Sequence, residues 1–253
     1  MSKAKILYYD LETAPILAAV WGLWEQNAVW VESEWYILCF AYRWEGEKKT
    51  HVISLPDYKR YKKSPEDDYD VVKKLWALFN EADVLIAHNG DKFDQRKSNA
   101  RFIYHGLTPP SFYKSVDTLK VARKNFAFDS NRLDSLGEHL KVGRKIKTDK
   151  DLWQGCLRGD LKAWKKMKLY NKQDVELLRD VYLKLRPWIA NHPSLSVIAD
   201  DPTACPKCGG HQLVRNGMKY TKTGKTQQWL CKECGGYAFS RGGEKIEKPL
   251  LVN

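Results

Sequence analysis

Two acidic residues interrupt an apolar segment near the start of the chain. In KILYYDLETAP, residues 5–15, Asp10 and Glu12 follow an apolar run that begins at Ile6. Side chains two residues apart on a strand point to one face, about 6–7 Å apart, so two carboxylates there repel and raise each other's pKa. A divalent cation removes this repulsion, and oxygen ligands suit Mg²⁺ or Mn²⁺. The pattern indicates either a metal site or a chance surface pair, such as the acids at 32 and 34.

Two later segments carry polar side chains that could join such a site. HNGDKFD, residues 88–94, follows the apolar run VLIA, so Asn89 is expected at the carboxyl end of a strand. Asp94 opens the next helix, whose dipole favours a carboxylate at that position. YNKQD places Tyr170 and Asp174 four residues apart, on one face of a helix. Taken singly, each segment is also explained by ordinary turn or helix preferences.

Four of the six cysteines form two pairs with metal-ligand spacing. Cys205 and Cys208 lie in CPKCGG, and Cys231 and Cys234 lie in CKECGG. Two such pairs predict a four-thiolate zinc site, and a glycine after each pair suits the tight turn around the metal. A redox dithiol is the alternative. Four sulfurs complete a tetrahedron, so His211 is expected to be a bystander.

The excess positive charge is confined to two segments. The chain has a net charge of +12, and residues 141–168 contain ten Lys or Arg against three Asp or Glu. Residues 203–253 contain nine against three, which leaves the rest of the chain near neutrality. This distribution favours a surface that binds a polyanion such as nucleic acid, although lysine-rich helices are often only solvated faces.

Targeting and membrane signals are not apparent in the sequence. No uncharged apolar stretch of about 18 residues could span a bilayer. The first residues run directly into an apolar strand without a signal or transit peptide. We expect no membrane association and a cytoplasmic location, in a bacterium or a phage-infected host cell.

Hydrophobic periodicity predicts an α/β fold. Three strands come first, and helices then alternate with further strands, an order that predicts a mixed sheet with helices on both faces. Ser64 is a candidate N-cap for the first helix, with Pro65 at its first position. The expected strands are 5–11, 34–44, 50–55, 83–89 and 114–117, and the expected helices are 64–82, 93–106, 118–126, 129–140 and 159–186.

The order of the acidic motifs resembles that of a known nuclease group. Asp-x-Glu ending the first strand, Asn-x-x-x-Phe-Asp after a buried strand and Tyr-x-x-x-Asp on a late helix resemble the three exonuclease motifs of the DEDD superfamily. That superfamily includes ribonuclease D and the proofreading domains of DNA polymerases. The resemblance covers about residues 5–186, and residues 116–140 also look like the connecting region of phage-type and family-B-polymerase-like members. It implies a ribonuclease H-like fold with a mixed five-stranded sheet flanked by helices.

The resemblance also implies roles for individual residues. Asp10 would bridge two Mg²⁺ or Mn²⁺ ions, Glu12 and Asp174 would hold the ion that activates water, and Asp94 would serve the other through its water shell. Tyr170 would mark the tyrosine subtype and orient the attacking water, because a phenol with a pKa near ~10 is mostly protonated at neutral pH. The histidine subtype would need His at position 169, which is Leu. Asn89 would contact the terminal nucleotide.

The cysteine module resembles zinc ribbons, and its second half is similar to those of transposase-like proteins. We expect it to hold one structural Zn²⁺ and to occupy residues 203–253 with a basic tail, after a proline-containing linker at 187–202 and a nuclease domain at 1–186. Its basic and aromatic side chains suit a surface that follows phosphates. A structural or protein-binding ribbon is the alternative. The candidates are Arg215, Lys219, Lys222, Lys225 and Trp229.

Five tryptophans between residues 21 and 44 could stack on bases, but packing in the core of a sheet and its covering loop explains them better. Trp21 and Trp24 are kept as substrate candidates because they follow the Asp-x-Glu strand directly.

These observations predict a 3′→5′ exonuclease that uses two divalent metal ions. DNA with a single-stranded 3′ end is the favoured substrate and RNA is possible, and a separate polymerase or replication protein is a possible partner. The alternatives are an exoribonuclease, a structure-selective endonuclease on the same fold, and a catalytically silent nucleic-acid-binding subunit.

Overall fold

The computed structural model describes residues 3–24, 27–221, 224–240 and 244–245. Contacts divide the chain into two compact units, Lys5–Val181 and Tyr182–Asn253 with Met1–Ala4. Each unit is described separately below. The boundary between them falls near the end of the longest helix, and the domain limits expected from the sequence stay a prediction.

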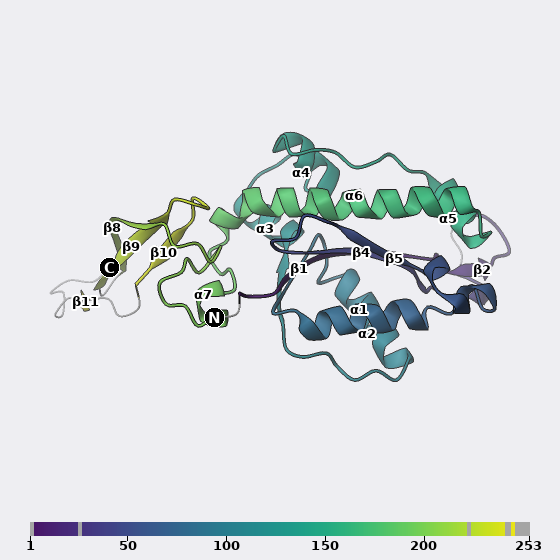
Figure 1. The fold of residues 1–253 in the computed structure, drawn as a ribbon. Helices are drawn as coiled ribbons and strands as arrows, with labels where there is room; N and C mark the ends of the chain where they lie inside the picture. The colour runs from purple at the N-terminus through teal and green to yellow at the C-terminus, as the bar shows by residue number, and fades with distance from the viewer. Residues whose placement is uncertain (1–2, 25–26, 222–223, 241–243, 246–253) are drawn as a thin grey trace. The chain divides into compact units, whose positions relative to one another are not determined.

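A mixed five-stranded sheet forms the centre of the first unit (Figure 1). Counted across the sheet, the second strand pairs antiparallel with the first and third strands. The third, fourth and fifth strands are parallel to one another, as expected for a meander followed by crossovers. The order is β5 (His51–Ser54), β4 (Ile37–Trp44), β1 (Ile6–Thr13), β6 (Val84–Ala87) and β7 (Lys114–Asp117).

Helices cover both faces of this sheet. In Figure 1, α1 (Tyr69–Glu81) and α2 (Asp94–Tyr104) lie on one side, and α4 (Leu133–His139) and α6 (Leu161–Leu185) lie on the other. The remaining helices are α3 (Thr118–Asn125), α5 (Lys150–Leu157), and the short 3₁₀ turns η1 (Leu55–Asp57) and η2 (Lys59–Lys62). This arrangement confirms the predicted fold class of a sheet between layers of helices.

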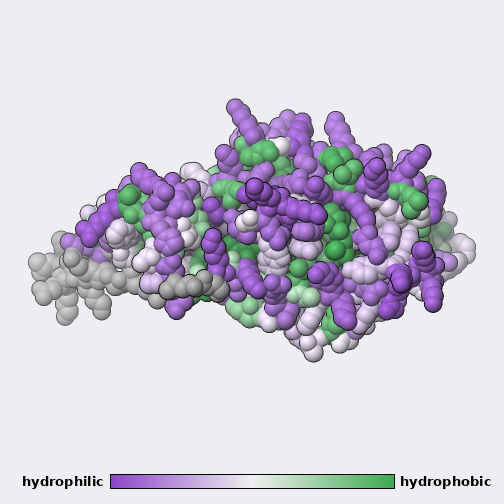
Figure 2. All heavy atoms as spheres, viewed as in Figure 1, coloured by the Kyte–Doolittle hydropathy of each residue, from purple (hydrophilic) through white to green (hydrophobic). Residues whose placement is uncertain are grey.

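The core explains why the strands read as apolar runs. All four residues of β6 are buried, as expected for a strand covered on both faces. Helix α1 buries Val71, Leu75 and Phe79, which recur at helical spacing along one side. Tyr9 of β1 packs edge-on against Phe79, with ring centroids 4.9 Å apart. The first unit therefore has a large hydrophobic core of its own. On the face seen in Figure 2, most side chains are hydrophilic, and apolar ones show between them.

The start of α1 differs from the expectation. The helix begins at Tyr69 after Asp68, whereas Ser64 lies in a preceding turn and its N–H bonds the carbonyl of Arg60. The buried carboxylate of Asp68 instead accepts a hydrogen bond from the Ile37 N–H at 2.8 Å and forms an ion pair with Arg101. The prediction of Ser64 as N-cap is therefore wrong, and at the observed start the N–H of Tyr69 bonds Asp67 Oδ1 at 3.0 Å.

A two-stranded ribbon lies outside the main sheet. It consists of β2 (Leu17–Ala19) and β3 (Trp30–Ser33), which pair antiparallel with each other. Trp21 and Trp24 are each 85% exposed, and Trp30 is 56% exposed. The expectation of packing in the core is wrong for Trp30, because no further layer covers the ribbon among the described residues, whereas the exposure of Trp21 and Trp24 is compatible with their being substrate candidates.

The second unit contains a small antiparallel sheet. Strand β9 (Gly224–Cys231) pairs with β8 (Leu213–Thr221), β10 (Tyr237–Phe239) and β11 (Glu244–Lys245). Before it come η3 (Arg186–Trp188) and α7 (Leu195–Ile198). The N–H of Leu195 bonds the carbonyl of Pro206 at 2.8 Å, so part of the expected linker contacts the cysteine module. The tail from residue 246 lies outside the described residues.

Across the described part of the chain, every helix is too short or too polar to cross a membrane.

Candidate nuclease active site and metal centres

Strand β1 delivers Asp10 and Glu12 to one face at its carboxyl end. Both are half-buried, and they pair across to Ala41 and Cys39 of β4. Asp174 lies on α6 and is almost fully buried. One carboxylate oxygen from each of the three acids lies within 4.8 Å of the others. The structure thus brings together three acids from positions 164 residues apart.

Asp94 lies against the same strand but outside that group of three. It is the first residue of α2 and is 2% exposed. Its Oδ1 accepts the backbone N–H of Leu11 at 3.2 Å, and Leu11 separates Asp10 and Glu12 in the sequence. The four expected acids therefore meet at one end of the sheet. We call Asp10, Glu12, Asp94 and Asp174 the acid cluster.

Burial raises the pKa of every member of the acid cluster. Burial raises the pKa of Asp10 most, and Asp94, Glu12 and Asp174 raise it further. Burial and Asp174 raise the pKa of Glu12 to about 8. Burial raises the pKa of Asp94 to about 7, although the N–H of Leu11 lowers it. Negative charge at this site is costly without a cation nearby.

Lys145 supplies one compensating positive charge. Its Nζ lies 2.7 Å from Asp174 Oδ2 and 5.1 Å from the centre of the Tyr170 ring. Burial lowers the pKa of Lys145, but Asp174 and Asp10 raise it by more, so the ammonium stays charged. The N–H of Lys145 bonds Asp134 Oδ1 at 2.7 Å, which fixes this loop to α4. In the sequence, Lys145 lies within a basic segment, and no motif distinguishes it from the other basic residues there.

Asn171 orients the carboxylate of Asp10. The side chain of Asn171 is fully buried, and its Nδ2 donates to Asp10 Oδ2 at 2.7 Å and to the Asp10 carbonyl at 3.2 Å. Its Oδ1 faces the thiol of Cys39 at 3.7 Å. No motif in the sequence distinguishes Asn171, and its position next to Tyr170 on the same helix is the available clue.

Tyr170 lies one helical turn before Asp174, as expected, and is 8% exposed. Burial and Asp174 raise the pKa of its phenol, so the hydroxyl keeps its proton at neutral pH. It can therefore donate a hydrogen bond within the site, and it lowers the pKa of Asp174.

The donor set fits hard divalent cations. Carboxylate oxygens at this spacing are suitable ligands for Mg²⁺ or Mn²⁺. Oδ1 of Asp174 is buried and has no hydrogen-bond partner among the described residues. A buried carboxylate oxygen without a donor is unusual unless a cation binds it.

Asn89 lies at the expected edge of the sheet, two residues after β6. Its φ of 65° is left-handed, and its N–H bonds Asp117 Oδ1 at 2.9 Å. The next residue must be glycine, because a Cβ on Gly90 would lie 2.5 Å from that of Ala87. Trp21 and Trp24 lie in the connection between β2 and β3 and are exposed.

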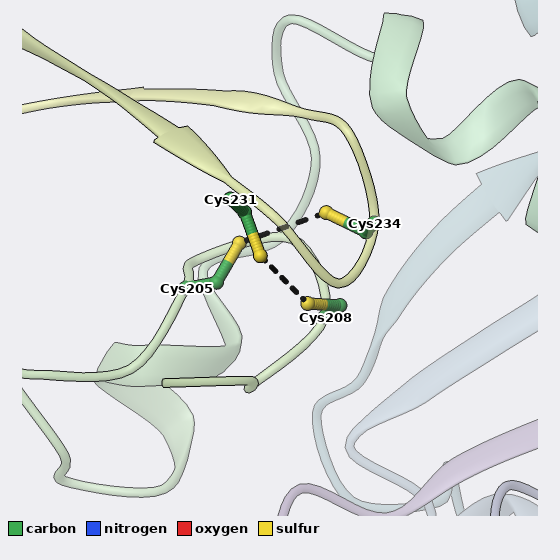
Figure 3. A group of neighbouring side chains, drawn as sticks. All are labelled: Cys205, Cys208, Cys231 and Cys234. Atoms are coloured by element: carbon green, nitrogen blue, oxygen red, sulfur yellow. Dashed lines mark hydrogen bonds between the residues drawn. The ribbon is translucent and has the colours of Figure 1, made fainter. Parts of the chain in front are cut away.

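The four paired cysteines meet at one point of the second unit (Figure 3). Their sulfurs lie within 4.8 Å of one another, with Cys205 facing Cys234 and Cys208 facing Cys231. We call these residues the cysteine cluster. Hydrogen bonding with Cys205 raises the pKa of Cys234 to about 11. Zn²⁺ would favour the thiolates, and four sulfurs match its tetrahedral preference.

The backbone of the two cysteine turns is nearly identical. Gly209 and Gly235 have φ of 75° and 74°, and each donates its N–H to the carbonyl of the first cysteine in its pair. Only glycine adopts this conformation at little cost. His211 lies outside the cluster, with Nε2 2.7 Å from Asp201 Oδ2. The spacing and glycines thus shape each turn, and the pairing of β8 with β9 brings the two turns together.

The basic candidates of the second unit contact aromatic rings. The guanidinium of Arg215 lies 5.7 Å from the ring centre of its cross-strand partner Trp229. Nζ of Lys219 lies 4.2 Å from the ring centre of Phe239. The Trp229 indole donates to Ser240 Oγ at 2.8 Å. Cations beside aromatic faces suit single-stranded nucleic acid. Lys222 lies outside the described residues.

Comparisons with known proteins agree with this architecture. A family model described as the RNase_H superfamily matches residues 32–186. No curated protein sequence matches the chain.

Among solved structures, the family B DNA polymerase of the hyperthermophilic archaeon Pyrobaculum calidifontis is similar, with a TM-score of 0.55 and 13% sequence identity. The match covers 88% of this chain and 32% of the polymerase chain, so the present chain spans about a third of that enzyme's length. At this identity the likeness concerns the fold alone.

Proposed function

The chain belongs to the RNase H superfamily, and on that basis we propose that it is a metal-dependent 3′→5′ exonuclease of the DEDD tyrosine subtype. Its substrate would be the 3′ end of DNA. The observation that carries the proposal is the meeting of Asp10, Glu12 and Asp174 within 4.8 Å, with Asp94 beside the same strand. The superfamily and this acid cluster support a nuclease in general.

The proposed roles of the side chains are those that the resemblance to the DEDD superfamily implies. Two Mg²⁺ or Mn²⁺ ions, when bound, would activate water, neutralise charge on the phosphate and assist the departing 3′ oxygen. Asp10, Glu12, Asp94 and Asp174 would hold these ions. Tyr170 is suited to orient the attacking water by donating a hydrogen bond, because burial and Asp174 keep its phenol protonated.

The remaining parts of the proposal concern binding. The cysteine cluster would hold one structural Zn²⁺, in a zinc ribbon. A separate polymerase is a proposed partner, and the cytoplasmic location stays a prediction. The proposed substrate contacts are Asn89, Trp21, Trp24, Arg215, Lys219 and Trp229.

The test is cleavage of 5′-labelled single-stranded DNA, duplex DNA and RNA with Mg²⁺, Mn²⁺ or EDTA. We expect a ladder that shortens from the 3′ end of DNA only when metal is present. Asp10→Ala should reduce the rate about a thousandfold or more, because the metal site is lost. A double variant of Glu32→Gln and Glu34→Gln, which have the same spacing, is the matched control and should cleave normally.

Other outcomes separate the alternatives. Shortening of RNA alone would indicate an exoribonuclease, and internal cuts would indicate an endonuclease. Binding without products in any metal would indicate a silent subunit. Near wild-type cleavage by Asp10→Ala would refute the assignment of the site.

A further inference from the structure

One buried carboxylate holds the turn that joins β6 to α2. Asp117 is the last residue of β7 and is 5% exposed. Its Oδ1 accepts the N–H of Asn89 at 2.9 Å and the N–H of Leu119 at 2.9 Å. Asn89 lies in the turn, whereas Leu119 lies at the start of α3. A single oxygen atom thus caps a helix and also fixes a turn that is distant in the sequence.

The backbone of this turn has an uncommon conformation. The φ of Asn89 is 65°, in the left-handed region that residues other than glycine seldom adopt. Such conformations persist where the surrounding structure imposes them, and they gather at functional sites. The hydroxyl of Thr118 also donates to the Ala87 carbonyl at 3.2 Å, so the start of α3 holds the end of β6 as well.

The same turn leads into the acid cluster. The Gly90 carbonyl accepts the N–H of Gln95 at 2.9 Å, and Asp94 immediately precedes Gln95. Burial is the main cause of the raised pKa of Asp94, and the carboxylate of Asp117 adds to it. Oδ2 of Asp117 is buried and has no hydrogen-bond partner within the described part of the chain. A serine would cap α3 without adding this charge. The longer side chain of Asp117 additionally reaches the N–H of Asn89.

We propose that Asp117 is a positioning residue, which acts through Asn89 to hold the terminal nucleotide of the substrate beside the acid cluster. This inference rests on the proposed function, in which Asn89 contacts that nucleotide. A fixed backbone at Asn89 limits the directions in which its side-chain amide can point. Asp94 keeps its separate bond from the Leu11 N–H, so loss of the Asp117 bond should weaken substrate binding more than it slows the chemical step.

The test separates the two functions of the Asp117 oxygen. Asp117→Ser keeps an acceptor for the cap of α3, but its side chain is one bond shorter and should release the N–H of Asn89. Asp117→Asn keeps the acceptor at full length. KM and kcat of the full chain are measured on 5′-labelled single-stranded DNA at saturating Mn²⁺. Asp117→Ser should raise KM about tenfold and change kcat less than about threefold, and Asp117→Asn should restore most of the wild-type KM.

Two further variants distinguish positioning from a loss of stability. Asn89→Gly removes the side chain and tolerates the left-handed backbone, so its KM should also rise about tenfold. Combined with Asp117→Ser, it should be no worse than either single change, because both act on one contact. Lys124→Gly weakens α3 at an exposed position away from the turn and should leave KM unchanged.

Three outcomes would overturn the inference: an unchanged KM in Asp117→Ser, a KM in Asp117→Asn as high as in Asp117→Ser, or losses that multiply in the double variant. A wild-type chain that binds the strand without cleaving it would contradict the proposed function alone. The dissociation constant then replaces KM with the same expected ratios, so the inference is still decided. A wild-type chain that does not bind the strand would overturn both.

Discussion

The acid cluster and the cysteine cluster are both groups of four metal-ligand side chains, but they are built differently. The cysteines come from two turns within residues 205–234, and the backbone of each turn positions its own pair. The acids come from β1, α2 and α6 and meet only because the sheet and helices pack. The first unit also has a large core, whereas few apolar side chains are buried in residues 203–240.

This difference indicates two different uses of metal. In the first unit the core holds the acids together despite their repulsion, and Lys145 offsets part of the charge. A metal bound to the acid cluster would take part in catalysis. In the cysteine module the four sulfurs lie where a hydrophobic core would otherwise be, so a bound metal would stabilise the folded state. Four changes would break or sharpen this contrast.

Removing zinc should have the largest effect. A thiol-directed chelator, or Cys208→Ser, should unfold residues 203–240, because structural zinc sites contribute about 10 kcal/mol or more to folding. Hydrogen exchange followed by mass spectrometry should show lost protection there and unchanged protection in residues 5–181. Protection retained by the module without zinc would show that its own packing suffices.

Replacing Lys145 should destabilise the first unit when metal is absent. Lys145→Gln leaves the buried Asp174 carboxylate without its cation, which should lower the free energy of unfolding by about 3 kcal/mol in EDTA. Mn²⁺ should recover most of this loss by supplying positive charge to the same acids. Lys168→Gln, which breaks an ion pair with the more exposed Asp57, is the control. Equal losses in denaturant titrations of the two variants would contradict the role given to Lys145.

Replacing Asn171 should affect metal use more than folding. Asn171→Leu keeps the branched shape of the side chain but removes the donor to Asp10 Oδ2, so activity should fall about tenfold to a hundredfold. The Mn²⁺ concentration for half-maximal activity should rise, which a purely structural role would not cause. Normal metal dependence with reduced stability would mean that Asn171 only fills space.

Glu12 should make the stability of the metal-free protein depend on pH. Its pKa is raised from 4.5 to about 8, so the protonated form stabilises the metal-free fold, and this stability is lost as pH rises through that interval. Glu12→Gln mimics the protonated form. In EDTA, the free energy of unfolding of Glu12→Gln should exceed that of wild type, and the difference should grow by up to about 1.4 kcal/mol per pH unit between those values.

Denaturant titrations at several pH values measure this difference directly. A constant difference across that range would mean that Glu12 is not desolvated in the folded protein.

Motifs whose chemistry depends on spacing were readable from the sequence. Paired cysteines followed by glycine, alternate acids on a strand, and Tyr170 and Asp174 one turn apart on a helix each depend on distances set by local backbone geometry. The burial of β6 and the start of α2 at Asp94 also follow from local pattern, and the mixed character of the sheet follows from the sequence of elements.

Other features were decided only by tertiary structure. Lys145 is one of ten basic residues in its segment, and its selection depends on how the loop after α4 is bonded to Asp134. Asn171 reaches Asp10 from 161 residues away. Trp30 was expected in the core because its residue type favours burial, yet no layer packs over it among the described residues. Local sequence sets backbone spacing and direction, whereas the contacts of a side chain depend on which distant segment the packed core brings beside it.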